Sequence, residues 1–356
     1  MSMFKLQDQY FTRLSPQGLV PDEKVSTEMN LLQIEAKELG ITCEVIPDSD
    51  VYKLTYKNHV EYLRDGAPTS NRLPGPQLCD NKALTRAMLA QLNLPIAKGF
   101  TYYRSDSSEY LQEIFSSLKA PLVIKPIDGA HGEGVKLNLT TFSELEKAVS
   151  TYFSESKSSH NLFAKEAILI EEMCKGSECR ILATKDKVLA VMSRRPASVV
   201  GDGIHSIKEL IEIKNKDEIR NISQDLYPHI KIDEDMIRIL KTNNYTVESI
   251  PDKEVTVQLR LVSNIMAGGD AYDLTDEIHP SVASIATKIV TALHGMTFVG
   301  IDFMSTDITA EQKTQQHAII EVNAAPEWAM HDMPMHGKKR HIAKELLILT
   351  FPELTK

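Results

Sequence analysis

Apolar and polar residues recur with helical and strand periods along much of the chain. Near the N-terminus, LLQIEAKELG has the pattern of an amphipathic helix that ends at Gly40, and ITCEVI has the pattern of a short buried strand. Residues 67–77, APTSNRLPGPQ, are rich in Pro, Gly, Ser and Asn. Because such residues interrupt helices and strands, we expect a linker there, at the boundary of a first β/α lobe.

Further helix and strand patterns follow this linker. Asp80 is expected to cap a helix. The apolar face of that helix is predicted to contain Leu84, Met88, Leu89 and Leu92. Strands are predicted at PLVIKP, AILIEE and VLAVM. Helices are predicted at HSIKELIEIKN, DEDMIRILKT and IHPSVASIATKIVTALHG, the last with Gly295 as its C-terminal stop.

Composition narrows the class of protein. Hydrophobic residues make up 42% and charged residues 25% of the 356 residues, as in ordinary soluble proteins with more than one lobe. The formal net charge of -9 argues against nucleic acid or an anionic membrane as partner, and favours a small polar substrate. No apolar run approaches the roughly 20 residues of a membrane span. The segment MSMFKLQDQYFTRL lacks the apolar core of a signal peptide, so we expect a cytoplasmic protein.

Two apolar strands near the C-terminus, TFVGIDFM and HAIIEVN, carry the most informative polar residues. Side chains two apart in a strand share a face, so Glu321 and Asn323 point the same way. If the two strands pair antiparallel, Asp302 lies beside them. Carboxylate and amide oxygens of this kind suit magnesium, which shares its remaining positions with water and phosphate. The alternative is that these residues only cap turns at strand ends.

Two other segments could contact a nucleotide. In VIKPIDGAHGEGV, a strand delivers Lys125 and then enters a glycine-rich loop, whose amides and lysine suit phosphate oxygens. A flexible hairpin would explain the same glycines. In ILIEEMCKGSECR, two carboxylates seven residues apart, Glu171 and Glu178, could serve an adenine edge and a ribose. Charge pairing on a surface turn is the alternative there.

The order and spacing of these segments resemble a known superfamily. DNKALTRAML, VIKPIDGAHGEGV, ILIEEMCKGSECRILA, VGIDFM and IIEVNAAPE are similar to the successive nucleotide and metal motifs of ATP-grasp proteins. RRPASVVGDGIHSIKELIEIKN and QLRLVSNIMAGGDAYDLTDEIHP resemble the glutathione-synthesising half of bacterial bifunctional glutamate-cysteine ligase/glutathione synthetases. Similar segments occur in the ATP-grasp domain of cyanophycin synthetases. The resemblance covers roughly residues 30–353.

The resemblance implies an α/β and α+β architecture, in which an ATP-grasp fold clasps ATP between lobes. The expected lobes are an N-terminal α/β lobe at 1–76, a small or lid lobe at 77–172, and a C-terminal lobe with the metal and substrate site at 173–356. Lys82 and Lys125 would bind the ATP phosphates. A loop with three glycines would close over these phosphates: Gly129, Gly132 and Gly134.

The remaining implied residues hold nucleotide, metal and substrate. Glu171 would lie at the adenine edge and Glu178 at the ribose. The metal ligands would be Asp302, Glu321 and Asn323, holding two magnesium ions that manganese could replace. Arg194 and Arg260 would face the acyl phosphate or a substrate carboxylate, with Lys125 as a further catalytic group. RRPAS has two arginines where the related pattern has one, so Arg195 is an alternative to Arg194.

The implied activity is that of an ATP-dependent, ADP-forming ligase. It would join a carboxylate to an amine through an acyl phosphate, with amino acids or peptides as substrates. Alternatives are a glutathione synthetase, a non-catalytic nucleotide-binding protein and a kinase that stops at the phosphorylated product. Because IMAGGD, RRPAS and AAPEWAMHDMPMH depart from the glutathione-synthesising pattern, we expect different substrates. A homodimer is compatible with the sequence.

Two conspicuous features are given a structural interpretation. His331, His336 and His341 recur every five residues, a spacing that keeps them on neither a helix face nor a strand face, so we do not predict a histidine metal site. Trp328 follows the predicted metal strand and is expected either to pack in the core or to line the substrate pocket. The four cysteines lack paired spacing, and we expect reduced thiols.

Overall fold

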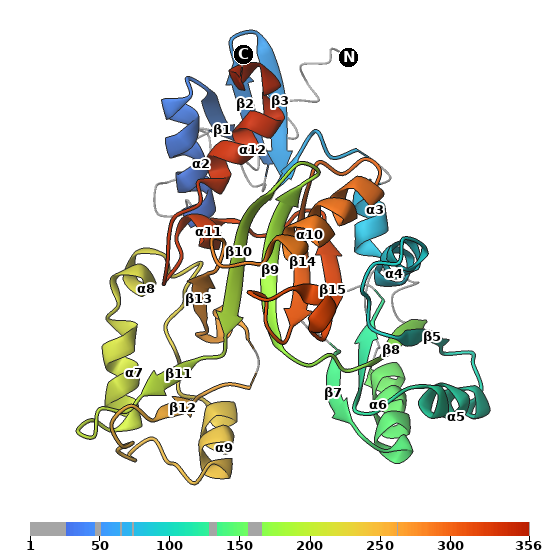
Figure 1. Cartoon of the computed structure of the whole chain (residues 1–356). Coiled ribbons are helices and arrows are strands. Elements are labelled where there is room, and N and C mark those ends of the chain that lie inside the picture. The colour runs from blue at the N-terminus through green and yellow to red at the C-terminus, as the bar shows by residue number, and fades with distance from the viewer. Residues whose placement is uncertain are drawn as a thin grey trace, which may run out of the picture. The chain divides into compact units, whose positions relative to one another are not determined.

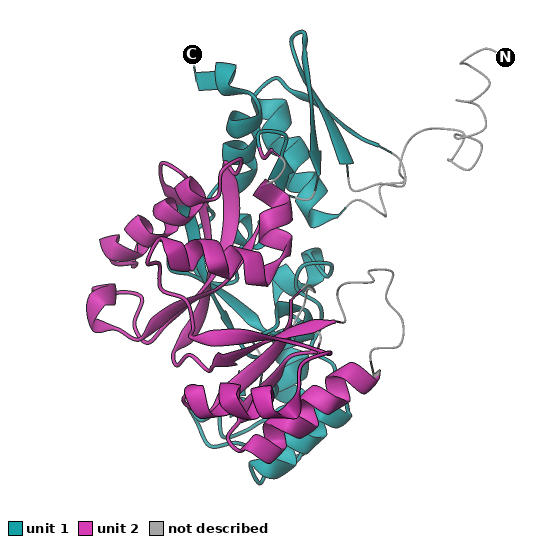
Figure 2. Cartoon of the chain, turned by 90° about the vertical axis from the view of Figure 1, so that its right-hand side faces the viewer, with its two compact units in different colours: residues 1–70, 189–275, 325–356 teal, residues 71–188, 276–324 magenta. Residues whose placement is uncertain are grey.

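The structure is a computed structural model (Figure 1) that describes residues 26–46, 51–64, 66–72, 75–127, 134–155, 166–261 and 263–355. It contains two compact units, each built from separate stretches of the chain (Figure 2). Unit 1 comprises residues 1–70, 189–275 and 325–356, and unit 2 comprises residues 71–188 and 276–324. One boundary, between Ser70 and Asn71, falls inside the expected linker. The division into three lobes that is expected above stays a prediction.

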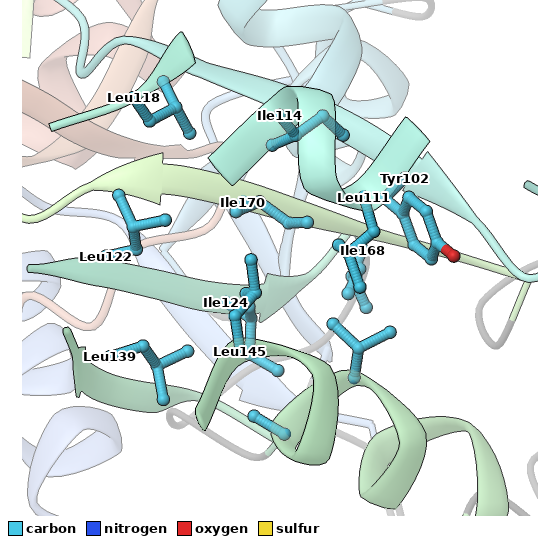
Figure 3. Packing of buried hydrophobic residues seen from close by; sticks show 12 residues of the cluster. Tyr102, Leu111, Ile114, Leu118, Leu122, Ile124, Leu139, Leu145, Ile168 and Ile170 are labelled. Carbon is cyan, nitrogen blue, oxygen red and sulfur yellow. The ribbon is translucent and has the colours of Figure 1, made fainter. Parts of the chain in front are cut away.

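The first sheet of unit 2 is antiparallel, with the order β5-β8-β6-β7. Its strands are β5 (Gly99–Tyr103), β6 (Leu122–Pro126), β7 (Lys136–Leu139) and β8 (Ala167–Glu172). Helices α5 (Ser108–Ser117) and α6 (Phe142–Glu155) pack against it. Figure 3 shows the resulting core, in which leucines and isoleucines of the helices meet those of the strands. The buried residues of β6 and β8 confirm the predicted strands PLVIKP and AILIEE.

The second sheet of unit 2 carries all three predicted metal residues. It contains β9 (Ser177–Thr184), β14 (Phe298–Ser305) and β15 (His317–Asn323), and β14 pairs antiparallel with both neighbours. This confirms the predicted pairing of the two apolar strands. Helix α10 (Pro280–Ala292) contacts β9 and β14, while α3 (Gly75–Asp80) and α4 (Lys82–Gln91) contact β15. A short 3-10 helix, η3 (Gln312–Thr314), precedes β15.

The start of α4 was predicted wrongly by one residue. Asp80 is the last residue of α3, and the side chain of Asn81 accepts the amide of Leu84 to cap α4. The apolar face was also partly wrong, since Leu84 and Leu92 are about half exposed (50% and 51%). The buried residues of α4 are Thr85, Arg86 and Leu89. A charged residue therefore occupies a position that the hydrophobic pattern could not assign to the interior.

Unit 1 contains the N-terminal and C-terminal parts of the chain. Its first sheet is an antiparallel meander of β1 (Thr42–Val45), β2 (Val51–Tyr56), β3 (His59–Arg64) and β4 (Ala67–Pro68). Its helices are α2 (Thr27–Glu38), α11 (Ala329–Asp332), α12 (Ile342–Thr350) and η4 (Pro352–Thr355). The prediction that ITCEVI is buried was wrong, because β1 lies at the edge of the sheet with exposed and half-buried side chains. Gly40 follows α2 with φ +70°, as predicted for its stop.

The rest of unit 1 is a pair of two-stranded ladders with three helices. β10 (Val188–Arg195) pairs with β13 (Asp270–Asp273), and β11 (Ser198–Val200) pairs with β12 (Thr256–Gln258). The helices are α7 (Ile207–Asn215), α8 (Glu218–Ile222) and α9 (Glu234–Thr242), with a 3-10 turn η2 (Ile265–Ala267). Apolar side chains of α7, α9, β11 and β12 form one core. Among the helices of the described ranges, none has the length and hydropathy needed to cross a bilayer.

Candidate functional site

A row of charged side chains crosses the second sheet of unit 2. Arg180 on β9 lies opposite Asp302 on β14, and Asp302 lies opposite Glu321 on β15. Arg180 Nε donates to Asp302 Oδ1 at 2.6 Å, and Lys82 Nζ on α4 lies 2.9 Å from Glu321 Oε1. Like charges placed directly opposite destabilise a ladder unless they are compensated. The two carboxylates therefore depend on nearby positive charge.

The third predicted metal residue lies on the same side of β15. Glu321 and Asn323 are half-buried while Val322 between them is buried, which confirms that they share a face. Asn323 Nδ2 donates to Asp302 Oδ2 at 3.4 Å. The antiparallel pairing thus brings Asp302, Glu321 and Asn323 together, as the sequence predicted.

A bulge in the β14–β15 ladder separates this group from the rest of the strand. Asp302 pairs with Glu321, but Phe303 pairs with Ile319, so Ile320 has no partner in the register. The carbonyl of Ile320 accepts instead from Lys125 Nζ, at 3.3 Å. Bulges redirect side chains and free main-chain groups. This one links the predicted phosphate lysine to the strand that carries the metal residues.

Lys125 also belongs to a buried cluster of three charges. Its Nζ lies 2.7 Å from Glu171 Oε2, and the guanidinium of Arg86 pairs with the other oxygen of the same carboxylate. Glu171 is only 2% exposed. A carboxylate buried this deeply is stable as an anion only when cations satisfy it. The carboxylate of Glu171 therefore holds Lys125 in place, and Arg86 holds Glu171.

A small pocket lies between α4 and β15, beside these charges. Its lining combines apolar and charged groups: Cys79, Lys82, Thr85, Arg86, Leu89 and residues 319–322. Burial raises the pKa of the Cys79 thiol to about 12, so it stays protonated and poorly nucleophilic at neutral pH. The pocket thus offers cations and a strand edge rather than a protein nucleophile.

The donor set fits a magnesium ion that is shared with a ligand. Asp302 and Glu321 each already attract a cationic side chain, and Asn323 adds an amide next to them. In the part of the chain that the structure describes, no cluster of three or more His, Cys, Asp or Glu side chains could hold a metal by itself. Magnesium commonly uses one or two carboxylates and completes its coordination with water and phosphate.

Two other predicted nucleotide residues, Gly134 and Glu178, belong to unit 2. Glu178 lies on β9, opposite Met304 of β14. Gly134 precedes β7 with φ +73°, whereas Gly129 and Gly132 lie outside the described residues. Sequence reasoning assigned no role to Arg86 or Arg180. A signal existed for Arg86, because it lies four residues after Lys82 in a predicted helix and so shares its face.

The two predicted substrate arginines belong to unit 1. Arg260 Nη2 donates to Asp233 Oδ2 at 2.6 Å and to the carbonyl of Lys231 at 3.2 Å, so it supports the start of α9. Arg194 is half-buried on β10, opposite Ala271 of β13. Its neighbour Arg195 is exposed and lies over the ring of Tyr272.

The VVGDG segment has a structural role at the start of α7. Asp202 accepts the amides of Ile204 and His205, and its carboxylate lies 2.6 Å from His205 Nδ1. The hydrogen bond with His205, together with these amides, lowers the pKa of Asp202. Ser206 and Glu209 then form a reciprocal cap of α7. The motif fixes how the chain enters this helix.

The remaining conspicuous residues lie in unit 1. Trp328 is fully buried. His331 is buried, His336 is exposed, and His341 Nδ1 lies 3.2 Å from Glu35 Oε1. These three histidines do not gather into a metal cluster within the described ranges.

A comparison with known protein families identifies the class of protein. Residues 81–200 match the family model for the carbamoyl-phosphate synthase L chain, ATP binding domain. The match begins at the cap of α4 and includes Lys82, Lys125 and Glu171. Together with the relatives described next, it identifies an ATP-grasp domain in this chain and confirms the predicted fold.

Particular relatives cover nearly the whole chain. It is 30% identical to cyanophycin synthetase from Crocosphaera subtropica, over 94% of this chain and 38% of that protein. It is 32% identical to the glutathione biosynthesis bifunctional protein GshAB from Mannheimia succiniciproducens, over 97% of this chain and 45% of that protein. The crystal structure of a bifunctional glutathione synthetase from Pasteurella multocida matches with a TM-score of 0.72 at 28% identity, over 92% of this chain and 44% of that one. The chain spans less than half the length of these relatives.

Proposed function

We propose that this protein is an ATP-dependent ligase that forms an amide bond between a carboxylate and an amine and releases ADP and phosphate. The observation that carries the proposal is the row of charges on β9, β14 and β15. Two neighbouring carboxylates, Asp302 and Glu321, lie between two cations, Arg180 of β9 and Lys82 of α4, and this arrangement suits a nucleotide with its metal ion. The match of residues 81–200 to an ATP binding domain supports ATP as the nucleotide.

The proposed chemistry has two steps. A carboxylate oxygen of the first substrate attacks the γ-phosphorus of ATP, the bond from that phosphorus to the β–γ bridging oxygen breaks, and ADP leaves. The amine nitrogen of the second substrate then attacks the acyl carbon, phosphate leaves with the bonding electrons, and the amine proton passes to solvent or a base. No protein nucleophile is needed, so catalysis rests on positioning and charge.

Lys82 and Lys125 are proposed to bind the phosphates. Lys82 now pairs with Glu321, and Lys125 with Glu171. When Lys82 exchanges its carboxylate partner for a phosphate oxygen, Glu321 becomes available to a metal ion. Asp302, Glu321 and Asn323 would hold magnesium, which supplies neutralisation of phosphate charge when bound. Two ions, and manganese as a substitute, are the finer form of this proposal.

The substrates are proposed to be amino acids or short peptides, as the names of the relatives suggest for those proteins. Arg194 and Arg260 are proposed to act on the acyl phosphate or on the oxyanion that forms when the amine attacks. For Arg260, this requires the guanidinium to exchange its present contact with Asp233 for the substrate. Glu171 and Glu178 remain the proposed contacts near adenine and ribose.

The decisive experiment measures ADP release with pooled carboxylates, with and without pooled amino acids and dipeptides. A ligase releases ADP when an amine is available, either with both pools or with the amino acids and dipeptides alone, which carry both reacting groups, and an amide product accumulates in equal amount. ADP release without an amine, together with a stable phosphorylated product, would indicate a kinase. No ADP release with any pool, despite ATP binding, would support a non-catalytic nucleotide-binding protein.

A glutathione synthetase is the second candidate, because the chain is 32% identical to the bifunctional glutathione biosynthesis protein. We expect inefficient use of γ-glutamylcysteine and glycine, since AGGD, RRPAS and AAPEWAMHDMPMH differ from the glutathione-synthesising pattern. The test is kcat/KM for that pair. A value above roughly 10⁴ M⁻¹s⁻¹, in the ordinary range of enzymes, would identify a glutathione synthetase instead.

A further inference from the structure

Three planar groups lie face to face in unit 1. The guanidinium of Arg195 on β10 lies 4.0 Å from the centroid of the Tyr272 ring on β13. The Tyr272 ring stacks on that of His336, with centroids 4.2 Å apart and planes 21° from parallel. Arginine over an aromatic face gains both cation–π attraction and a fixed orientation. We call Arg195, Tyr272 and His336 the planar stack.

The polar edges of the planar stack are unused. Within the described ranges, neither the guanidinium of Arg195, the hydroxyl of Tyr272 nor the ring nitrogens of His336 has a hydrogen-bond partner or an ion pair. Arg195 and His336 are exposed, and Tyr272 is half-buried. By contrast, the nearby Arg340 is fully engaged with the carboxylate of Asp273. The stack therefore combines a fixed geometry with free donors.

A buried charge cluster supports the stack from β13. Asp270 lies opposite Arg195 in the ladder, and its carboxylate accepts from Lys214 Nζ at 2.5 Å and from Arg220 Nη2 at 2.8 Å. Arg220 is fully buried and also donates to the carbonyls of Gly268 and Gly269. A Cβ on Gly269 would stand 2.7 Å from the carbonyl oxygen of Arg195. Glycine there lets this turn lie directly against the strand that carries Arg195.

The His336 end of the stack is fixed as well. The amide of His336 donates to the carbonyl of Ala271 at 3.1 Å, and the amide of Asp273 donates to the carbonyl of His336 at 2.8 Å. Arg340 then binds Asp273 from the same C-terminal segment. Main-chain hydrogen bonds therefore hold the strands and the segment at both ends of the stack. The planar groups are presented by rigid backbone rather than by a loose surface loop.

We propose that the planar stack binds the carboxylate of the amine substrate, which ATP does not activate. Arg195 would be the anchor for this carboxylate. A planar guanidinium held flat can offer two parallel N–H groups to the two oxygens of a carboxylate. The aromatic wall suits the carbon chain of an amino acid or short peptide. This assigns carboxylate recognition to Arg195 rather than Arg194, and it rests on the proposed ligase function.

The test compares binding of free acids with binding of the corresponding amides. The probes are alanyl-aspartate, alanyl-lysine, alanyl-leucine and alanyl-phenylalanine, each also as the C-terminal amide, measured by saturation-transfer NMR at millimolar concentration. Wild-type protein should bind at least one acid roughly tenfold more tightly than its amide. Arg195→Gln should remove this selectivity, and Arg195→Lys should restore only part of it because a lysine lacks the planar fork.

Arg104→Gln is the matched control. Arg104 is an exposed arginine in unit 2 that lies 5.0 Å from the centroid of the Phe153 ring. It should keep the selectivity of the wild type. Tyr272→Ala, which removes the support for Arg195, should weaken binding of the acids more than Tyr272→Phe. An unchanged thermal midpoint for Arg195→Gln separates loss of the anchor from loss of the fold.

The outcomes are distinct from those of the ligase proposal. No acid selectivity in the wild type, or equal selectivity in wild type and Arg195→Gln, would overturn the assignment. Loss of selectivity in Arg104→Gln as well would show a non-specific charge effect and would also overturn it. Lys125→Ala should lower ADP release by roughly 10²–10³-fold but leave acid selectivity intact. If ADP release fails in the wild type while the selectivity is present, the ligase proposal fails alone.

Discussion

Each unit of the molecule contains a buried carboxylate that pairs with one lysine and one arginine, and the two clusters differ in the groups that surround these cations. In unit 2, Glu171 pairs with Lys125 and Arg86. In unit 1, Asp270 pairs with Lys214 and Arg220. Both carboxylates are nearly inaccessible, at 2% and 4% exposure. The same device of charge compensation thus occurs in both units.

The difference lies in the neighbours of the cations. Arg220 donates to three backbone carbonyls, those of Pro228, Gly268 and Gly269. Its guanidinium therefore fixes the main chain at these positions. Lys125 has one carbonyl partner, Ile320, and lies beside a strand that carries further charges. We infer that the unit 1 cluster acts on stability, and that the unit 2 cluster keeps a lysine oriented for phosphate. The predictions below test this contrast.

The largest effect is expected from breaking the unit 1 cluster. Arg220→Met leaves the buried Asp270 carboxylate with one cation. It also leaves three main-chain carbonyls without the hydrogen bonds that Arg220 donates. Losing one partner of a buried ion pair costs about 3–5 kcal/mol in the free energy of unfolding. Urea denaturation should show this loss. Arg238→Met is the control, because its pair with Asp235 is exposed and should contribute little. Equal stability of both variants would contradict the contrast.

The next effect concerns catalysis rather than folding. Lys125→Ala, Asp302→Asn and Glu321→Gln should each lower kcat for ADP formation by roughly 10²–10³-fold, the usual cost of removing a preorganised electrostatic contact. Circular dichroism should remain that of the wild type. Near-wild-type turnover of purified Glu321→Gln would exclude the proposed metal site. If Lys125→Ala unfolds instead, the unit 2 cluster would act on stability, as the unit 1 cluster does.

A smaller effect is expected from the turn that Arg220 holds. Gly268 has φ +90°, and a Cβ there would lie 2.7 Å from Ile230 Cγ1. Gly268→Ala should therefore lower the free energy of unfolding by about 1–3 kcal/mol, the usual cost of a strained backbone residue. Gly203→Ala is the comparison, since Gly203 has φ +75° but a Cβ there would make only ordinary contacts, the nearest with Lys253 N at 3.7 Å. If Gly203→Ala is as harmful as Gly268→Ala, backbone conformation rather than packing against Ile230 sets the cost.

The smallest effect distinguishes two neighbouring caps in unit 2. Asn81→Ala removes the side chain that caps α4 and should cost about 1 kcal/mol of stability. Asp80→Ala should change stability by less than about 0.5 kcal/mol, because Asp80 lies at the end of α3 and caps nothing. A larger loss of stability for Asp80→Ala would support the sequence-based prediction that Asp80 caps the helix.

The sequence predicted those parts of the site that depend on local periodicity. Glu321 and Asn323 had to share a face because strand side chains alternate, and two adjacent apolar strands made their pairing with Asp302 a natural expectation. Lys125, the proposed phosphate lysine, could be placed at a strand end from the strand pattern of PLVIKP. These inferences needed only residues close together in the chain or in neighbouring strands.

The sequence could not predict contacts between distant segments. Arg86 and Glu171 are 85 residues apart, and no local pattern shows that a buried arginine on α4 faces a carboxylate on β8. The burial of Arg220 likewise depends on carbonyls that come from three other positions. Apolar patterns treat charged residues as exposed, so Leu84 was assigned to the interior and Arg86 was not. Compensation of a buried charge can be recognised only once its partners are known.

The bulge at Ile320 implies that β15 tolerates changes of length poorly. A single-residue insertion between Ile319 and Glu321 would turn Glu321 and Asn323 away from Asp302. A deletion of Ile320 would keep Glu321 opposite Asp302, but it would remove the bulge and the carbonyl that accepts from Lys125 Nζ. Homologous sequences that keep this chemistry should therefore show substitutions but no gaps across this segment.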